Sequence, residues 1–196
     1  MNKLFFFIFS TIFITLLPSC KSDYEKWVSQ ELGKGVRNDS LLLGIHFGMT
    51  RSDFYNHCLE LNRKNLITNG PENNTAQIVI NDYSEPFDLN FYPDFEKDKI
   101  HIMRFYFSYK QWAPWNKAFF SEKLRPNALD YLTKKYGGSF KELKTPSGKP
   151  FWLSINGNRQ IRVFLRDSKT VAVDISDLTV TLDPNATKPG HPVTPE

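Results

Sequence analysis

A helix-forming pattern followed by strand-forming patterns occurs twice along the chain, and this order limits its fold more than any other feature. In the first half, Thr50 and Asp53 have the spacing of a helix start, and Phe54, Cys58 and Leu61 share one helical face. The segments at 78–83, 87–92 and 99–108 then alternate in the manner of half-buried strands. We expect one helix and a three-stranded antiparallel meander.

The second half has the same order. We expect a helix to begin at Pro114, to break or restart at Pro126 and to end at Gly137. Strands are expected at 151–155, 159–165 and 171–175, where apolar residues occupy odd-numbered positions. The predicted fold class is α+β, with one helix-and-meander unit repeated twice.

The N-terminal segment has the pattern of an export signal. Residues 4–17 form an unbroken run of apolar residues and Ser/Thr, with the length of a secretory hydrophobic region. The run ends at Leu17-Pro18-Ser19-Cys20, which resembles the lipobox of bacterial lipoproteins. In that family the cysteine is diacylated, becomes the new N-terminus when the signal peptide is removed, and is then acylated again. The resemblance implies lipidation of Cys20 and attachment to the membrane through a lipid anchor.

These features divide the chain into five expected parts. They are a signal peptide at 1–19, a lipid anchor with a short helix and linker at 20–43, α+β units at 44–110 and 111–182, and a disordered tail at 183–196. Ser22 and Glu25 form the capping box that predicts the short helix. Lys21 replaces the Asp that often signals retention at the inner membrane in lipoproteins. We therefore expect the cell envelope, at the outer membrane, facing the periplasm or the cell surface.

A second resemblance concerns the first unit. Phe47-Gly48-Met49-Thr50 opens a helix behind a lipobox and ahead of a meander, over about residues 44–108. This arrangement resembles the Gly-Met-Thr start of the BamE-like (SmpA/OmlA) and β-lactamase-inhibitor-protein-like folds, which are small bacterial envelope modules. The resemblance implies a non-enzymatic protein that binds other proteins in the envelope.

Charge is distributed unevenly between the halves. Residues 21–98 carry 8 Lys/Arg against 13 Asp/Glu, whereas residues 99–182 carry 15 against 6. A basic second half favours an anionic partner, either an envelope protein or an anionic glycan, and a basic surface without a partner is the alternative. An exported lipoprotein meets little nucleic acid, so no nucleic-acid partner is expected.

The sequence contains no recognisable catalytic or metal-binding motif. Consecutive helical residues point about 100° apart, so His57 and Cys58 cannot pair as base and nucleophile. The histidines lack the spacing of a zinc site, and Asp94, Glu96 and Asp98 fit a solvated hairpin tip better than a calcium loop. We expect no catalytic residues, no metal and no cofactor.

The alternation of odd- and even-numbered residues between the two faces of a strand predicts how the last three strands pair. If odd-numbered residues face the core, a three-residue loop at 156–158 pairs Leu153 with Ile161. By the same rule the following turn pairs Val163 with Val173. Both registers leave the even-numbered residues on an outer face.

Four residues of this outer face are candidates for partner binding. The predicted registers place Trp152, Arg162 and Asp174 in one row, with Phe164 and Arg166 beside it. Tryptophan and arginine are frequent interface anchors, so the candidates are Trp152, Arg162, Phe164 and Arg166. The alternative is a cross-strand cluster that only stabilises the sheet.

Two further tryptophans, Trp112 and Trp115, lie between the units. Aromatic residues at helix starts usually pack inward, as we expect of both, and the alternative is a platform for a sugar ring. The sequence thus predicts a lipid-anchored envelope lipoprotein acting as a non-catalytic protein-interaction module. A glycan-binding surface lipoprotein is the first alternative, and an enzyme without a recognisable motif is the second.

Overall fold

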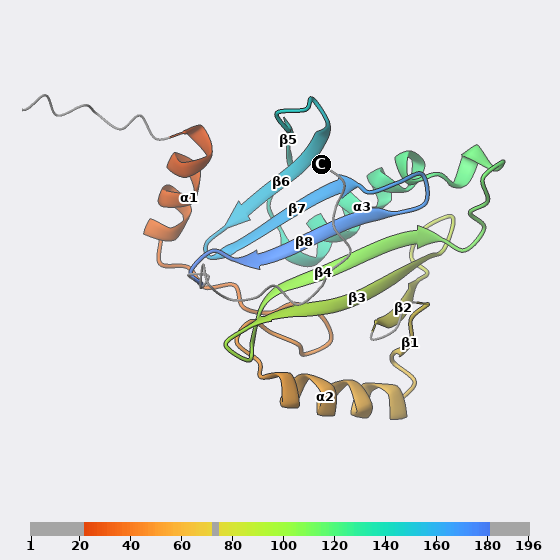
Figure 1. Ribbon diagram of the computed structural model, residues 1–196, viewed down its shortest axis with the longest axis horizontal. Coiled ribbons are helices and arrows are strands. Elements are labelled where there is room, and N and C mark those ends of the chain that lie inside the picture. The colour runs from red at the N-terminus through yellow and green to blue at the C-terminus, as the bar shows by residue number, and fades with distance from the viewer. Residues whose placement is uncertain (1–21, 72–74, 181–196) are drawn as a thin grey trace, which may run out of the picture.

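The computed structural model describes residues 22–71 and 75–180, which form helices and one antiparallel sheet (Figure 1). The predicted α+β class is confirmed. The predicted signal peptide at 1–19, the lipidation site Cys20 and the tail at 183–196 lie outside the described residues.

Three α-helices and eight strands are found in the described part of the chain. The helices are α1 (Asp23–Gly33), α2 (Arg51–Arg63) and α3 (Ser121–Tyr136). The strands are β1 (Thr68–Asn69), β2 (Ala76–Ile80), β3 (Phe87–Glu96), β4 (Lys99–Tyr109), β5 (Lys141–Lys144), β6 (Pro150–Asn156), β7 (Arg159–Leu165) and β8 (Val171–Asp177). A short 3-10 turn, Lys117–Phe119, precedes α3.

All eight strands belong to one sheet in the order β1-β2-β3-β4-β8-β7-β6-β5. Four strands follow α2 and four follow α3, and the last strand of each set, β4 and β8, pair at the centre of the sheet. The prediction of three strands in each half missed β1 and β5. β1 has only two residues, and β5 is a charged edge strand, so neither shows the alternation of a half-buried strand.

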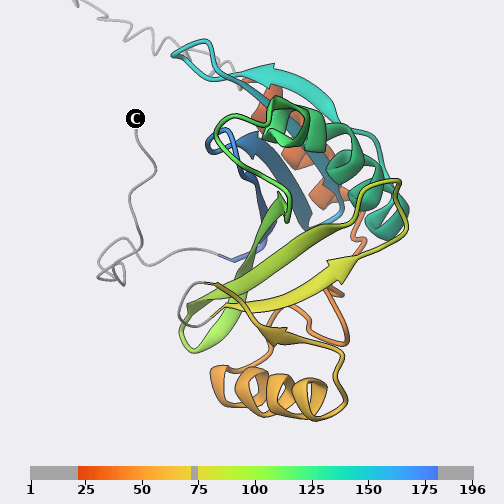
Figure 2. The same ribbon diagram turned by 90° about the vertical axis from the view of Figure 1, so that its right-hand side faces the viewer.

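One face of the sheet, which we call the core face, packs against α3 (Figure 2). Leu124, Ala128 and Leu132 of α3 are fully buried there. The helix begins at Ser121 and not at the predicted Pro114, and it continues through Pro126 without a break. Burial of residues on both sides of Pro126 offsets the one backbone hydrogen bond that a proline removes.

The core face of the first half is covered by the segment between α1 and α2. Leu41, Leu42, Ile45 and Phe47 of this segment are all buried, so it forms part of the core. A tight turn with positive φ at Leu43 and Gly44 folds the segment back, with Leu41 N–H donating to Ile45 O at 2.9 Å. On α2, Phe54 makes edge-to-face ring contacts with Tyr92 and Phe95.

The buried Arg159 of β7 connects this segment to α3. Its guanidinium donates to Ser40 O at 3.2 Å and to Tyr136 O at 3.0 Å, and it stacks on the Tyr136 ring at 4.8 Å. The Tyr136 hydroxyl in turn donates to Leu41 O at 2.8 Å. These bonds fix the segment between α1 and α2 against the second half of the sheet.

The predicted register of β6 with β7 is wrong. The loop contains two residues, Gly157 and Asn158, so Trp152 pairs with Val163 and Leu153 pairs with Arg162. Gly157 has a φ of +58°, and a Cβ added there would lie 2.2 Å from Val36 O, so a glycine is required for this tight turn. The two-residue loop turns Trp152 toward the core face.

Parity failed on β6 because both faces of this strand are buried. Leu153 and Ile155 face away from the core and are still only 2% and 6% exposed. On that side α1 contacts β6, and the Tyr24 hydroxyl donates to Gln160 Oε1 at 2.8 Å. The predicted register of β7 with β8 is confirmed, since Val163 pairs with Val173.

Candidate functional site

The face of the sheet opposite α3, which we call the outer face, carries a chain of alternating charges across β3, β4, β8 and β7. Arg104 Nε donates to Asp94 Oδ2 at 3.0 Å, and Arg104 Nη1 donates to Asp174 Oδ1 at 3.1 Å. The second oxygen of Asp174 accepts from Arg162 Nη2 at 2.7 Å. Asp174 therefore holds two arginines that come from different halves of the chain.

Beside these ion pairs the outer face carries two aromatic rings with an arginine on each. The Arg162 guanidinium lies 5.4 Å from the centre of the Phe164 ring, and the Arg166 guanidinium lies 5.4 Å from the centre of the Tyr106 ring. Tyr106 and Phe164 both pair with Ala172, whose methyl group leaves room for a ring on each side. We call Arg162, Phe164, Tyr106 and Arg166 the cation-aromatic strip.

Three of the four predicted binding residues, Arg162, Phe164 and Arg166, therefore lie together on the outer face. Trp152 does not join them, because it is buried on the core face with the Arg125 guanidinium of α3 at 4.4 Å from its ring. The residue that pairs with Arg162 on the outer face is Leu153 and not the predicted Trp152.

Sequence reasoning missed Arg104 and Tyr106 as members of this face. Both are even-numbered residues of β4, which alternate with the fully buried Met103, Phe105 and Phe107. This alternation was the available signal for their exposure. What could not be foreseen was that β4 pairs with β8 and so brings Arg104 to Asp174.

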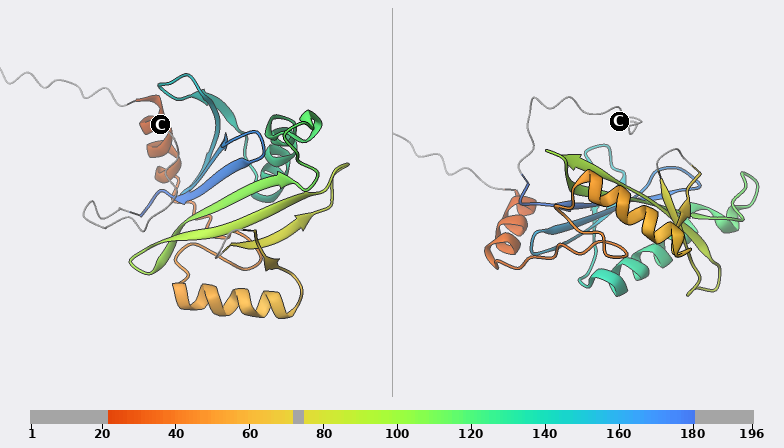
Figure 3. Two further views of the ribbon diagram at one scale, coloured as in Figure 1. Left: turned by 45° about the vertical axis from the view of Figure 1, so that its right-hand side comes forward. Right: turned by 90° about the horizontal axis from the view of Figure 1, so that it is seen from below.

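The loop between β4 and α3 lies at the same end of the sheet as the turn between β7 and β8 (Figure 3). Trp112 Nε1 donates to Ser168 O at 3.1 Å, and the Lys169 ammonium lies 5.7 Å from the centre of the Trp112 ring. Trp115 is 85% exposed, so its predicted inward packing is wrong. Because α3 begins at Ser121, Trp115 precedes the helix and lies on no amphipathic face.

A small hollow of about 60 Å³ opens on the outer face beside this turn. Its lining includes Asn90, Tyr106, Ser108, Arg166, Lys169 and Thr170. Asn90 is 7% exposed, and its Oδ1 has no hydrogen-bond partner within the described residues. The hollow thus combines a buried polar atom with two cationic side chains.

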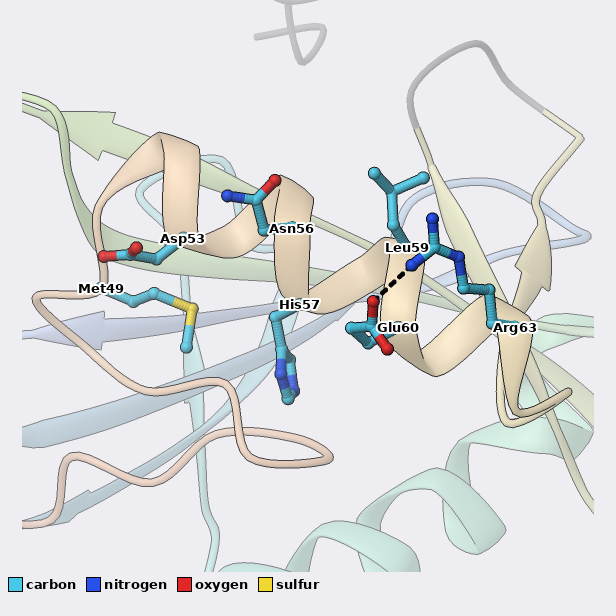
Figure 4. Close-up of a pocket in the computed structure, with 7 residues that line it drawn as sticks. All are labelled: Met49, Asp53, Asn56, His57, Leu59, Glu60 and Arg63. Atoms are coloured by element: carbon cyan, nitrogen blue, oxygen red, sulfur yellow. Dashed lines mark hydrogen bonds and ion pairs between the residues drawn. The ribbon is translucent and has the colours of Figure 1, made fainter.

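The larger depression, of about 450 Å³, lies on the exposed side of α2 (Figure 4). His57 Nε2 hydrogen-bonds the Leu43 carbonyl at 2.7 Å, and Glu60 is paired with Arg63 at 2.6 Å. The side chains drawn in Figure 4 point in different directions and do not converge on a common point. This arrangement does not assemble a nucleophile with a base.

Within residues 22–71 and 75–180, no three His, Cys, Asp or Glu side chains come close enough together to hold a metal ion. No helix in this part of the chain is both long and apolar enough to cross a membrane. Comparison of the chain with protein-family models, curated proteins and solved structures finds no match. The functional proposal below rests on the arginine and aromatic side chains of the outer face.

The Cys58 thiol of α2 is expected to react slowly. It is partly buried beside the core cluster, and burial raises its pKa to about 11 because desolvation disfavours the thiolate. Near pH 8 its thiolate fraction is then about 100-fold below that of an ordinary exposed thiol. Reaction of the folded Cys20→Ala variant with a chromogenic disulfide reagent measures this. A rate equal to that of the urea-unfolded protein would show that this face of α2 is open.

Proposed function

We propose that the protein is a lipid-anchored, non-catalytic binding module of the cell envelope that engages another envelope protein through the outer face of its sheet. The cation-aromatic strip is the observation that carries this proposal. The lipobox-like segment that ends at Cys20 supports the anchor, and Lys21 in place of an Asp supports the outer-membrane location. The repeated order of one helix and four strands supports a BamE-like or β-lactamase-inhibitor-protein-like architecture.

The strip is suited to binding because its arginines are already positioned. Arg162 is held by Asp174 at one end and lies over Phe164, so it loses little side-chain freedom when a partner docks. Arginine and aromatic side chains supply a large share of the binding energy at protein interfaces. The neighbouring Arg166 adds a second exposed cation, which favours an acidic patch on the partner.

A photocrosslinking amino acid placed at Phe164 tests the location of the interface. It is expected to capture a specific envelope protein in intact cells, because Phe164 lies in the strip. The same amino acid at Glu122, which is exposed on α3 on the opposite side of the sheet, is the matched control. Capture of the same protein from Glu122 and not from Phe164 would place the interface on the other side.

With the captured partner in hand, Arg162→Ala is expected to weaken binding by about 30-fold or more, which corresponds to the roughly 2 kcal/mol of an interface anchor. Lys149→Ala removes the same charge from the exposed loop between β5 and β6 and is expected to leave the affinity unchanged. Titration calorimetry on both variants decides the point. Equal affinity of Arg162→Ala and the parent would exclude the strip as the interface.

A second function, glycan binding, is favoured by the exposure of Trp115. An indole that is 85% exposed has a free face on which a sugar ring can stack, and Trp112 is only partly buried nearby in the chain. Quenching of tryptophan fluorescence by soluble polysaccharides tests this function. Loss of the quenching in Trp115→Ala would assign it to that residue.

A further inference from the structure

We propose that the hollow beside the β7–β8 turn is a subsite for an acidic sugar residue, carboxylated or sulfated, of an anionic glycan. The inference rests on the second function proposed above, and it adds the chemical class of the ligand and the residues that select it. Three features of the hollow support it: a buried acceptor, a pair of cations and a neighbouring aromatic face.

The buried acceptor is Asn90 Oδ1. A side-chain carbonyl that is removed from water without a hydrogen bond is destabilising, so the site gains when a ligand supplies a donor. A sugar hydroxyl is such a donor. Ser108 and Thr170 place their own hydroxyl-bearing side chains in the same lining, which gives a sugar further hydrogen-bonding partners.

The cations are Arg166 and Lys169. Among the described residues neither forms an ion pair, and each is instead placed against an aromatic ring, Arg166 on Tyr106 and Lys169 on Trp112. The nearby Asp167 accepts the backbone N–H groups of Lys169 and Thr170 at 2.8 Å each, which fixes the turn. Two cations that have no carboxylate partner in the described part of the chain favour an anionic group on the ligand.

The size of the hollow decides how a sugar would sit. About 60 Å³ is the space of a few water molecules, so it admits the polar edge of one ring and not a whole residue. The rest of the glycan would lie over the rim, where the Trp112 ring stands beside Lys169 and the turn. An acidic sugar carries its anionic group and its hydroxyl groups on one ring, so a single residue can meet the cations and donate to Asn90 Oδ1 together.

Binding of three probes to the full mature protein tests the proposal: polygalacturonate oligomers for carboxylates, chondroitin sulfate oligomers for sulfates, and dextran as the neutral reference. At least one acidic probe is expected to bind 10-fold or more tightly than dextran, measured by tryptophan fluorescence and calorimetry. Comparison of the two acidic probes shows whether the hollow prefers a carboxylate or a sulfate.

The double variant Arg166→Ala/Lys169→Ala is expected to lose at least 10-fold in affinity for the acidic probe. The control Lys144→Ala/Lys149→Ala removes the same charge near β5, outside the hollow, and is expected to retain the parent's affinity. Asn90→Ala is expected to weaken binding as well, with thermal unfolding recorded to separate lost contacts from lost stability.

The failures of the two proposals are distinguishable. If the probes bind but acidic and neutral ones bind equally, or if both double variants lose affinity alike, the subsite is overturned while glycan binding stands. If none of the probes binds, both are overturned. A crosslinker at Thr170 that captures an envelope protein while no probe binds would assign the hollow to the protein interface.

Discussion

The Asp174→Ala variant is expected to lose about 2 to 3 kcal/mol of unfolding free energy, which corresponds to a fall of roughly 5 to 10 °C in Tm. Asp174 is 8% exposed and accepts hydrogen bonds from Arg104 and Arg162. Removing the carboxylate leaves the Arg104 guanidinium, whose side chain is 26% exposed, with Asp94 alone. Thermal and urea unfolding of the purified protein measure the loss.

Two companion variants show whether charge or packing is responsible. Asp174→Asn keeps the shape and removes the charge, so it is expected to lose most of the same stability. Glu60→Ala breaks an exposed ion pair with Arg63 on α2 and is expected to cost less than about 0.5 kcal/mol. Parental stability of Asp174→Asn would show that the carboxylate charge contributes nothing to the sheet.

The Cys20→Ala variant is expected to lose acylation completely. We propose Cys20 as the acceptor because it ends the lipobox-like segment Leu17-Pro18-Ser19-Cys20, whereas the other cysteine, Cys58, is a partly buried residue of α2. Several acyl chains anchor a protein stably because each buried methylene contributes about 0.8 kcal/mol, whereas a single chain binds reversibly. Metabolic labelling with a palmitate analogue measures the loss.

Cys58→Ala is the matched control for this variant and is expected to retain the label. Both substitutions remove one thiol, so a general effect of cysteine loss would appear in both. Incorporation of label into Cys20→Ala at the parental level would refute the lipobox.

The local sequence pattern was sufficient to predict the structure where one face of a helix or strand is buried and the other is exposed. The caps at Ser22 and Thr50 were read correctly, since each side chain accepts from the backbone N–H three residues later. The register of β7 with β8 also followed from parity, because β7 alternates between the buried Val163 and the exposed Arg162.

The local sequence pattern did not predict the structure correctly where tertiary contacts bury both faces of a strand or bring together segments that are distant in sequence. Leu153 and Trp152 are both buried, by α1 and α3 respectively, so the sequence of β6 does not reveal which residue faces the core. The same limit applied to the candidate site. Arg162, Phe164 and Arg166 were found from their own hairpin, whereas Tyr106 and Asn90 come from the other half of the chain.

The pairing of β4 with β8 has a consequence for how the protein is made. Met103, Phe105 and Phe107 lie on a strand whose partner is encoded about 70 residues later, at Val171–Asp177. A chain that emerges from its N-terminus therefore exposes a long apolar strand edge until the final strand arrives, and such edges pair readily with other chains. We therefore expect the closure of this central seam to be a late step of folding, because strands that are far apart in sequence pair slowly.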